Sequence, residues 1–237
     1  MLLTKKDKAI IAEIVGKIDY TPALSPNETS KAVIKACEET KRYGFATVCV
    51  YPTWAKLAAE QMKGSSSGVL VTIGYPHGST VTESKVAETR KVLEDGATEI
   101  DMVMNIARLL DGDYEYVKQD IKAVVDCARE FKRGVKVIME VGYLSDAQKV
   151  KVTELSIEAG AEYVKTCTGF GPGKACIHDV LLLKAAGGDR IKVKATGGVA
   201  SLEDQREFIK CGASRVAARG NILDQLMEIG IAGKGDL

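Results

Sequence analysis

Two lysines and an aspartate occupy short, strand-like runs of this sequence in which apolar residues are the norm. Lys165 lies in EYVKT, Lys194 in IKVKA and Asp101 in EIDMVM. A charge buried without a partner costs several kcal/mol, so three such residues are unexpected unless they meet one another. A lysine in a dry site beside a second cation loses its proton readily and becomes a nucleophilic amine. The three residues therefore favour Schiff-base chemistry, in which an amine attacks a carbonyl and an acid or base moves protons.

The alternation of side chains along a strand predicts which residues face inward. In EIDMVMN the methionines form one apolar side, which places Asp101 on the opposite, inward side. In IKVKAT the same reasoning places Lys192, Lys194 and Thr196 inward. In YVKT, Lys165 lies on the side opposite to its two neighbours. We therefore expect two ammonium groups and one carboxylate to meet in a common interior.

A structural role for the same residues is the alternative interpretation. Lys165 and Lys194 could extend toward the mouth of a barrel and pair with Asp101 as an ion cluster without catalytic use. The pattern alone leaves both interpretations open.

The elements that must position these residues alternate along the chain. Runs with strand character are separated by longer segments with helical spacing and charged faces, as βα units require. The expected strands are 15–19, 45–50, 69–73, 99–104, 135–140, 162–166, 191–195 and 215–217. The expected helices are 28–43, 53–63, 82–95, 113–131, 145–159, 176–187, 201–211 and 221–230, with an additional helix at 4–14.

Eight βα units in 237 residues favour a (β/α)8 TIM barrel with an additional N-terminal helix, formed by residues 1–237 as a single domain. An open doubly wound sheet is the rival architecture. It is disfavoured because no glycine-rich dinucleotide fingerprint follows the first strand. Ser145 and Ser201 are expected to cap the helices that follow them.

Composition excludes several classes of function. Lys and Arg number 33 against 32 Asp and Glu, so the net charge of +1 gives no field for nucleic acid or an anionic membrane. No apolar run approaches the roughly 20 residues of a membrane span. The six cysteines lack disulfide or metal spacing, which predicts free thiols and a cytoplasmic location. We expect a homo-oligomer, whose size the helix faces do not reveal.

Six motifs, in order along nearly the whole chain, resemble the deoxyribose-phosphate aldolase family of class I aldolases. They are TVCVYP (47–52), TIGYPHG (72–78), GATEIDMVMN (96–105), KVIMEVGYLSD (136–146), AGAEYVKTCTGF (159–170) and VKATGGV (193–199). The resemblance implies a (β/α)8 barrel and reversible cleavage of the sugar phosphate 2-deoxy-D-ribose 5-phosphate to acetaldehyde and D-glyceraldehyde 3-phosphate.

The resemblance also implies roles for individual residues. Lys165 is similar to the Schiff-base lysine, Lys194 to the second lysine that perturbs it, and Asp101 to the carboxylate that relays protons. Thr168 and Cys49 match positions that line the substrate site. A Schiff-base aldolase with a different aldehyde acceptor, and a catalytically silent barrel that binds sugar phosphates, are the alternative functions.

Two segments are expected to bind the phosphate group. TGGV follows a strand and precedes a helix, so Gly197 and Gly198 let backbone N–H groups approach an anion. GASRVAARGN spans the last strand and the start of the last helix. Here Ser214 is followed by Arg215, where the family usually has a second serine. Whether Arg215 or Arg219 binds phosphate is left open.

Other residues are expected to have structural roles. Asp19 at the end of the first strand is interpreted as a structural hydrogen-bonding residue, and Cys167 as a small filler. GFGPGK lacks the spacing of a P-loop, and the two histidines, His77 and His178, lack metal-ligand spacing. We therefore expect no metal and no cofactor.

Overall fold

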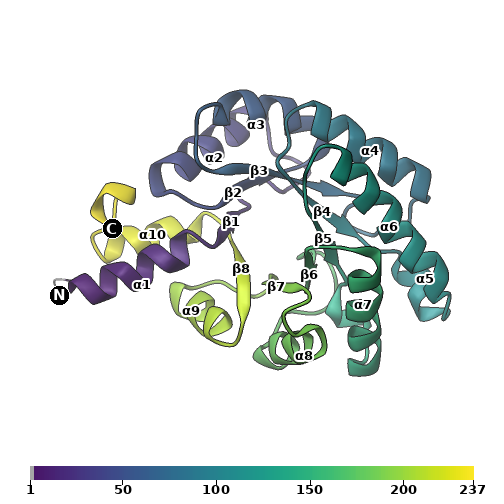
Figure 1. Cartoon of the computed structure of the whole chain (residues 1–237). Helices are drawn as coiled ribbons and strands as arrows, with labels where there is room; N and C mark the ends of the chain where they lie inside the picture. The colour runs from purple at the N-terminus through teal and green to yellow at the C-terminus, as the bar shows by residue number, and fades with distance from the viewer. Residues whose placement is uncertain (1–2) are drawn as a thin grey trace.

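Eight parallel strands form a closed barrel in the order β1 to β8, and β8 pairs with β1. The computed structural model describes residues 3–237, so the first two residues of the expected domain lie outside it. Figure 1 shows the strands at the centre and the helices around them. The strands are β1 (Ile18–Tyr20), β2 (Thr47–Val50), β3 (Gly68–Ile73), β4 (Glu99–Val103), β5 (Val135–Ile138), β6 (Tyr163–Lys165), β7 (Lys192–Ala195) and β8 (Ala213–Ala218).

Helices follow the strands and cover the outside of the barrel, as a (β/α)8 fold requires. They are α1 (Lys5–Val15), α2 (Ser30–Tyr43), α3 (Ala55–Met62), α4 (Thr82–Glu94), α5 (Ile106–Leu110), α6 (Tyr114–Glu130), α7 (Asp146–Ala159), α8 (Ile177–Gly187), α9 (Leu202–Lys210) and α10 (Asn221–Glu228). Short 3-10 turns are η1 (Pro52–Trp54), η2 (Val141–Tyr143) and η3 (Lys234–Asp236). The predicted barrel and its additional N-terminal helix are confirmed.

The predicted boundaries differ from the structure in a few places. The first strand begins at Ile18 because α1 continues to Val15. The short helix α5 was not predicted, and it begins where the side chain of Asn105 accepts a hydrogen bond from the N–H of Arg108 at 3.1 Å. The expected fifth strand ends at Ile138, two residues before its predicted limit.

The alternation predicted for β4 is confirmed. Ile100 and Met102 belong to the apolar core between the strands and the helices, whereas Asp101 lies on the other side of the strand and is fully buried. Strand register places Lys165 beside Lys194, and neighbouring residues of a parallel ladder point to the same side of the sheet. Lys192 follows the same alternation but lies at the amino end of β7, where it is exposed.

Helix caps fix where two of the predicted helices begin. Ser145 accepts a hydrogen bond from the N–H of Gln148 and thereby caps α7. Ser201 accepts one from the N–H of Asp204 at 3.0 Å and caps α9. Both residues form capping boxes, so the two predicted caps are confirmed.

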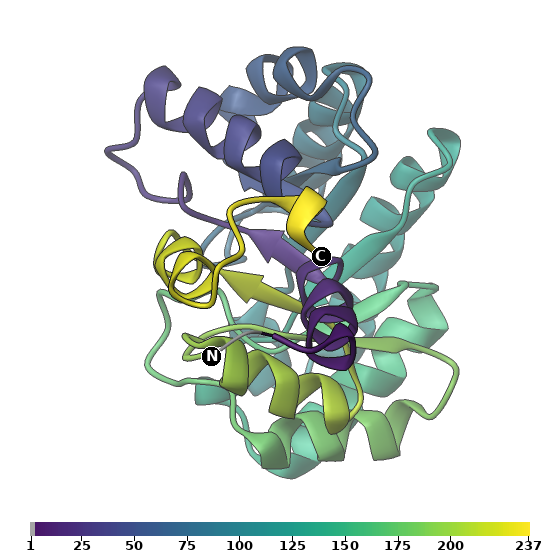
Figure 2. The same ribbon diagram turned by 90° about the vertical axis from the view of Figure 1, so that its left-hand side faces the viewer.

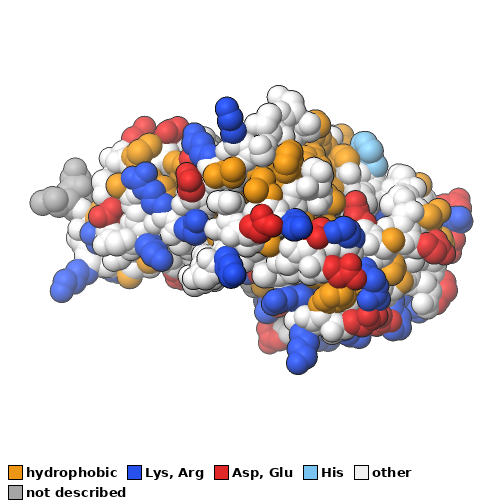
Figure 3. Space-filling model, turned by 90° about the horizontal axis from the view of Figure 1, so that it is seen from above, with side chains coloured by type: hydrophobic (Ala, Val, Ile, Leu, Met, Phe, Trp, Pro, Cys, Tyr) orange, Lys and Arg blue, Asp and Glu red, His pale blue; other side chains and the backbone are white. Residues whose placement is uncertain are grey.

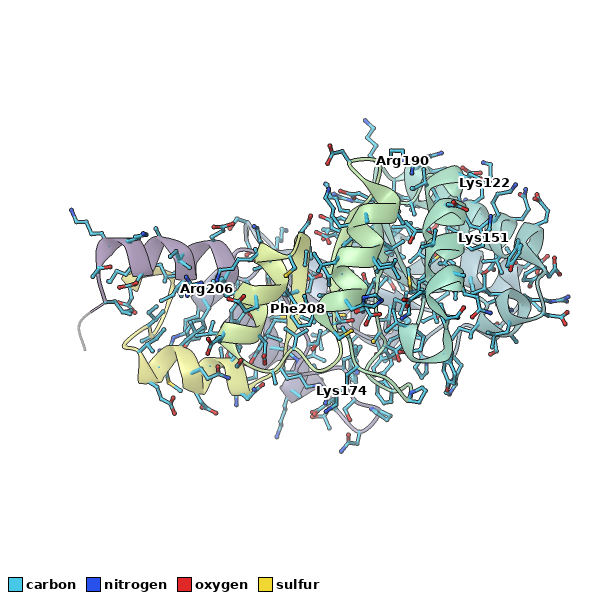
Figure 4. The ribbon with its side chains drawn as sticks, turned by 90° about the horizontal axis from the view of Figure 1, so that it is seen from below. Lys122, Lys151, Lys174, Arg190, Arg206 and Phe208 are labelled. Atoms are coloured by element: carbon cyan, nitrogen blue, oxygen red, sulfur yellow. The ribbon has the colours of Figure 1, made fainter. Side chains whose placement is uncertain are left out.

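Two labelled residues identify the two ends of the barrel. Figure 4 shows Lys174 near the start of α8 and Arg190 near its far end. Lys174 follows β6 and therefore marks the end where the strands finish, whereas Arg190 precedes β7 and marks the end where they begin. Active sites of this fold form at the first of these ends.

The N-terminal helix packs beside the last residues of the chain, as Figures 1 and 2 show. The Lys8 ammonium donates a hydrogen bond to the carbonyl of Asp236, and Arg42 on α2 donates one to the carbonyl of Ala232 at 2.6 Å. These contacts connect the chain ends to the outer helical layer.

Candidate active site

Lys165 ends β6 inside the barrel and has only 3% of its surface exposed. Its Nζ lies 2.7 Å from Oδ2 of Asp101, which enters from β4. Strands β4 and β6 are separated by β5, so this contact crosses the interior of the barrel. The structure therefore brings the predicted nucleophile and the predicted carboxylate together.

Lys194 approaches the same carboxylate from β7. Its Nζ lies 2.8 Å from Oδ2 of Asp101 and 2.6 Å from Oδ2 of Asp19. Two lysine nitrogens thus converge on a single oxygen atom. Thr47 donates a hydrogen bond of 2.7 Å to the other carboxylate oxygen of Asp19. Asp19 is therefore an internal partner of Lys194, in line with its structural interpretation.

The two lysines differ in their electrostatic environment. Burial lowers the pKa of Lys165 below its ordinary value, and the positive charge of Lys194 lowers it further, against the opposing effect of Asp101. Burial acts in the same direction on Lys194, but the carboxylates of Asp101 and Asp19 outweigh it and raise the pKa of Lys194. Lys194 therefore stays charged, while Lys165 is the amine that loses its proton more easily.

Asp101 stays ionised between the lysines. Burial alone would raise its pKa, but the charges of Lys165 and Lys194 reverse this and hold the pKa of Asp101 well below its ordinary value. Cys49 lies buried near these groups on β2, and burial raises the pKa of its thiol to about 12. The thiol of Cys49 is therefore an uncharged group in the barrel interior at neutral pH.

A cavity of about 300 Å³ opens over Lys165. Its size is at the lower end of the range for small-molecule sites. Its lining combines the amine of Lys165 with residues from the ends of β6, β7 and β8. The lining residues are Thr21, Leu24, Lys165, Thr168, Gly169, Thr196, Gly197, Gly198, Val199, Ala200, Ala217, Ala218, Arg219 and Asn221.

The predicted phosphate residues separate into two groups. Gly197 and Gly198 line the cavity, and their φ angles of 87° and 82° are ones that residues with a side chain rarely adopt. Arg219 also lines the cavity. Ser214 and Arg215 are not among the residues that line it, so the cavity gives no support to their expected role in phosphate binding.

The position of Arg215 corrects its predicted role. Its guanidinium binds the carboxylates of Asp19 and Glu99, with 2.8 Å between Nη2 and Oε1 of Glu99. Glu99 is the first residue of β4, so Arg215 points toward the end of the barrel where the strands begin. Ser214 lies in β8 where the ladder with β7 is irregular, next to Arg215.

Two residues of the site were not predicted. Glu140 is buried at a φ of 56°, and its Oε2 accepts hydrogen bonds from both the N–H and the hydroxyl of Thr168, the former at 3.0 Å. Tyr75 donates a hydrogen bond to the carbonyl of Thr168 and packs edge-on against Phe170. Together they fix the loop after β6. The sequence carries only a weak signal for Glu140, which directly follows an apolar run.

The ends of β6 and β7 are joined by threonine side chains. Thr166 donates a hydrogen bond of 2.8 Å to the carbonyl of Thr196 and accepts one of 2.9 Å from its N–H. The hydroxyl of Thr196 donates to the carbonyl of Cys167 at 2.5 Å. The segments that carry Lys165 and Gly197 are thus held in a fixed relative position.

Similarity to known proteins agrees with this geometry. A profile described as DeoC/LacD family aldolase matches residues 14–224. The chain belongs to this family. It is 47% identical over 209 residues to a deoxyribose-phosphate aldolase of Bacillus cytotoxicus, covering 88% of this chain and 93% of the relative. It is 43% identical to a deoxyribose-phosphate aldolase of Caldanaerobacter subterraneus, covering 93% of this chain and 95% of the relative.

The barrel of this DeoC/LacD family member also resembles a solved structure. The tetrameric deoxyribose phosphate aldolase of Aeropyrum pernix superposes with a TM-score of 0.82 at 27% identity, covering 95% of this chain and 97% of that one. Within residues 3–237, no group of three or more His, Cys, Asp or Glu side chains is arranged to hold a metal ion. No helix in the same range is long and apolar enough to cross a membrane.

Proposed function

We propose that this protein cleaves 2-deoxy-D-ribose 5-phosphate reversibly to acetaldehyde and D-glyceraldehyde 3-phosphate through a Schiff base on Lys165. The observation that carries the proposal is the convergence of Lys165 and Lys194 on one oxygen of Asp101, with Lys165 itself lining a cavity. Relatives named deoxyribose-phosphate aldolase, with which the chain shares 43% and 47% of aligned residues, support the choice of substrate.

The reaction begins with the neutral amine of Lys165. Its nitrogen adds to the aldehyde carbon of the open-chain sugar, and the resulting carbinolamine loses water to give a protonated imine. Lys194 remains charged, so it can donate a hydrogen bond to the oxygen that leaves as water. Burial lowers the pKa of Lys165 and thereby favours the unprotonated, nucleophilic form of its nitrogen.

Cleavage then breaks the bond between the second and third carbons of the sugar. A base removes the proton of the third carbon's hydroxyl, a carbonyl forms there, and the electrons of the broken bond move into the imine to give an enamine. Protonation of the second carbon and hydrolysis release acetaldehyde from Lys165. We assign the relay of these protons through water to Asp101, which is hydrogen-bonded to Lys165.

We assign the phosphate group of the substrate to the part of the same cavity that Gly197, Gly198 and Arg219 line. Gly197 and Gly198 line the cavity without a side chain, and α10 begins at Asn221, which also lines it. A helix N-terminus and a guanidinium both attract a phosphate. We therefore assign Arg219, together with the glycine segment, to phosphate binding.

The assembly and the location of the protein are further parts of the proposal. We infer a homo-oligomer, because a related barrel is a tetramer and exposed apolar side chains lie on the surface. We also infer a cytoplasmic location, which six free cysteines favour. Figure 3 shows basic and acidic side chains interspersed over one face, in keeping with a partner that is neither nucleic acid nor membrane.

A coupled assay for glyceraldehyde 3-phosphate tests the proposal. We expect release of this product from the phosphorylated deoxysugar by the wild-type protein and none by Lys165→Ala. If the protein forms a Schiff base with acetaldehyde but releases no glyceraldehyde 3-phosphate, a different aldehyde acceptor is indicated. Absence of both activities would indicate a barrel that only binds sugar phosphates.

A further inference from the structure

The ion network of the active site continues through the barrel to the end where the strands begin. The Nζ of Lys136 on β5 lies 3.7 Å from Oδ1 of Asp101, and the same ammonium binds Glu99. Arg215 binds both Asp19 and Glu99. Ion pairs therefore form an unbroken set of contacts from the substrate cavity to the opposite end.

The far end of this network has contact with solvent. Glu99 and Arg215 line a second cavity of about 490 Å³ among the loops that precede the strands. Their side chains are 26% and 17% exposed, whereas that of Lys136 is 2% exposed. The substrate cavity and this second cavity are lined by different residues. The second cavity can therefore be altered without touching the substrate.

The network carries one positive charge in excess when all of its members are ionised. Its described members are four cations and three carboxylates. The cations are Lys136, Lys165, Lys194 and Arg215, and the carboxylates are Asp19, Glu99 and Asp101. A buried net charge is unfavourable. Loss of the proton of Lys165 removes this excess positive charge.

We propose that Glu99, Lys136 and Arg215 are positioning residues that control, from the far end of the barrel, whether Lys165 is a free amine. Glu99, Lys136 and Arg215 are together called the floor cluster. This inference rests on the proposed function, because it assumes that Lys165 reacts as a neutral amine. None of the three residues lines the substrate cavity.

Other ionisable groups around Lys165 do not change this balance. Burial raises the pKa of Cys49 to about 12, so the thiol is uncharged. Burial likewise raises the pKa of the phenols of Tyr51 and Tyr75, which follow the ends of β2 and β3. The inward-facing ionisable residues, by strand, are Asp19 on β1, Cys49 on β2, Glu99 and Asp101 on β4, Lys136 on β5, Tyr163 and Lys165 on β6, Lys192 and Lys194 on β7, and Arg215 on β8.

An exposed pair at the same end of the barrel provides a matched control. Lys192 and Glu162 lie 2.9 Å apart, and their side chains are 54% and 47% exposed. Solvent screens such a pair, so removing either charge should leave the protonation of Lys165 unchanged.

Removing charges of opposite sign from the floor cluster should have opposite effects. Glu99→Gln enlarges the positive excess, so Lys165 should lose its proton at lower pH. Arg215→Gln removes the excess, so Lys165 should keep its proton to higher pH. A purely structural role would weaken activity in both variants without displacing their pH dependence in opposite directions.

The test is the rate at which borohydride traps acetaldehyde on Lys165, followed by mass spectrometry across a range of pH. On the acidic side of the wild-type profile, at about pH 6, we expect Arg215→Gln to react roughly tenfold more slowly than wild type, since a unit charge about 10 Å away shifts protonation by about one pH unit. Glu99→Gln should react several-fold faster there. Lys136→Gln should resemble Arg215→Gln and serves in its place if that variant does not fold.

Two outcomes would overturn the inference. The first is that Glu99→Gln and Arg215→Gln displace the profile in the same direction. The second is that neither moves it further than the exposed controls Glu162→Gln and Lys192→Gln. If the wild-type protein itself is not labelled, the Schiff-base proposal fails instead, so the two failures are distinguishable.

Discussion

The chemistry of the site depends on one oxygen atom that two lysines share. Lys165 and Lys194 both lie within 2.8 Å of Oδ2 of Asp101, yet their pKa values move in opposite directions. The difference arises because Lys194 has a second carboxylate, Asp19, at 2.6 Å. The pKa of the lysine next to two carboxylates is raised, whereas that of the lysine next to one is lowered, as the proposed reaction requires.

Replacement of Lys194 tests this division of roles. Lys194→Leu removes the cation that helps to lower the pKa of Lys165, and it leaves Asp101 to hold the proton there. The pH at which Lys165 reacts with acetaldehyde should therefore rise, with a lower rate at neutral pH. Lys210→Leu, which changes an exposed lysine on α9, is the control and should not alter the profile. An unchanged profile in Lys194→Leu would refute the assigned role.

The role of Arg219 is tested by comparing two substrates. Arg219→Ala should raise the KM for the phosphorylated deoxysugar by about tenfold or more, because a hydrogen bond to a charged group contributes about 1.5–3 kcal/mol. Cleavage of the unphosphorylated sugar should hardly change. Arg190→Ala, at the opposite end of the barrel in Figure 4, should affect neither substrate. Equal loss with both substrates would contradict phosphate binding by Arg219.

At the scale of elements, the site depends on how the ends of β6 and β7 are held together. The loop after β7 passes so close to the loop after β6 that there is no room for a side chain at Gly197. A methyl group placed there would lie 2.8 Å from Cβ of Cys167. Glycine therefore allows the loop after β7 to approach the strand that carries Lys165.

Gly197→Ala tests this close approach. The substitution forces a residue with a side chain into a positive φ and pushes the two loops apart, so we expect a KM for the phosphorylated substrate raised at least several-fold. Thermal unfolding should reveal a stability loss of about 1–2 kcal/mol from the backbone conformation alone.

Gly64→Ala is the control for Gly197→Ala, because Gly64 has a φ of 77° with no atom within 4 Å of the added methyl group. It should lose a similar amount of stability but keep its KM. If Gly197→Ala also keeps the wild-type KM, the loop does not bind phosphate.

At the scale of the whole molecule, the buried charges link stability to pH. Burial would raise the pKa of Asp19, but Lys194, Lys136 and Arg215 lower it from 3.8 to about 2. A carboxyl group with a lowered pKa in the folded state stabilises the protein above the pKa of the unfolded chain. This contribution is lost as the pH falls through the folded value. Asp101 acts in the same direction.

We therefore expect the urea midpoint of unfolding to fall steeply as the pH is lowered from about 4 to about 2. This range lies between the ordinary pKa of Asp19 and its lowered pKa in the folded protein. Asp19→Asn should be less stable at neutral pH and should show a smaller fall in this window. Asp189→Asn, which alters a fully exposed carboxylate, should follow the wild-type curve. An acid dependence in Asp19→Asn as steep as in the wild type would exclude this linkage.

The sequence was sufficient for the barrel and for the central three residues because both depend on simple periodicity. Alternation along β4 and β7 requires Asp101 and Lys194 to face inward. Inside the barrel, the two opposite charges can neutralise each other by forming an ion pair. Alternation does not tell which end of the barrel a long side chain reaches. For this reason the sequence leaves open whether Arg215 binds phosphate. The residue faces inward but reaches the end of the barrel where the strands begin.

Other parts of the site depend on features that a residue pattern does not contain. The carboxylate of Glu140 reaches Thr168 only because its backbone adopts a positive φ, which is uncommon for glutamate. The five-residue helix α5 is too short for helical spacing to be visible. The assignment of residues 1–237 to one domain stays a prediction.

The most direct measurement is to locate the group that acetaldehyde and borohydride attach to the wild-type protein. Peptide mass spectrometry should find a mass gain of one ethyl group on Lys165 and on no other lysine, including the buried Lys194. Label on Lys194 in place of Lys165, or no label on either residue while the protein is folded, would contradict the account.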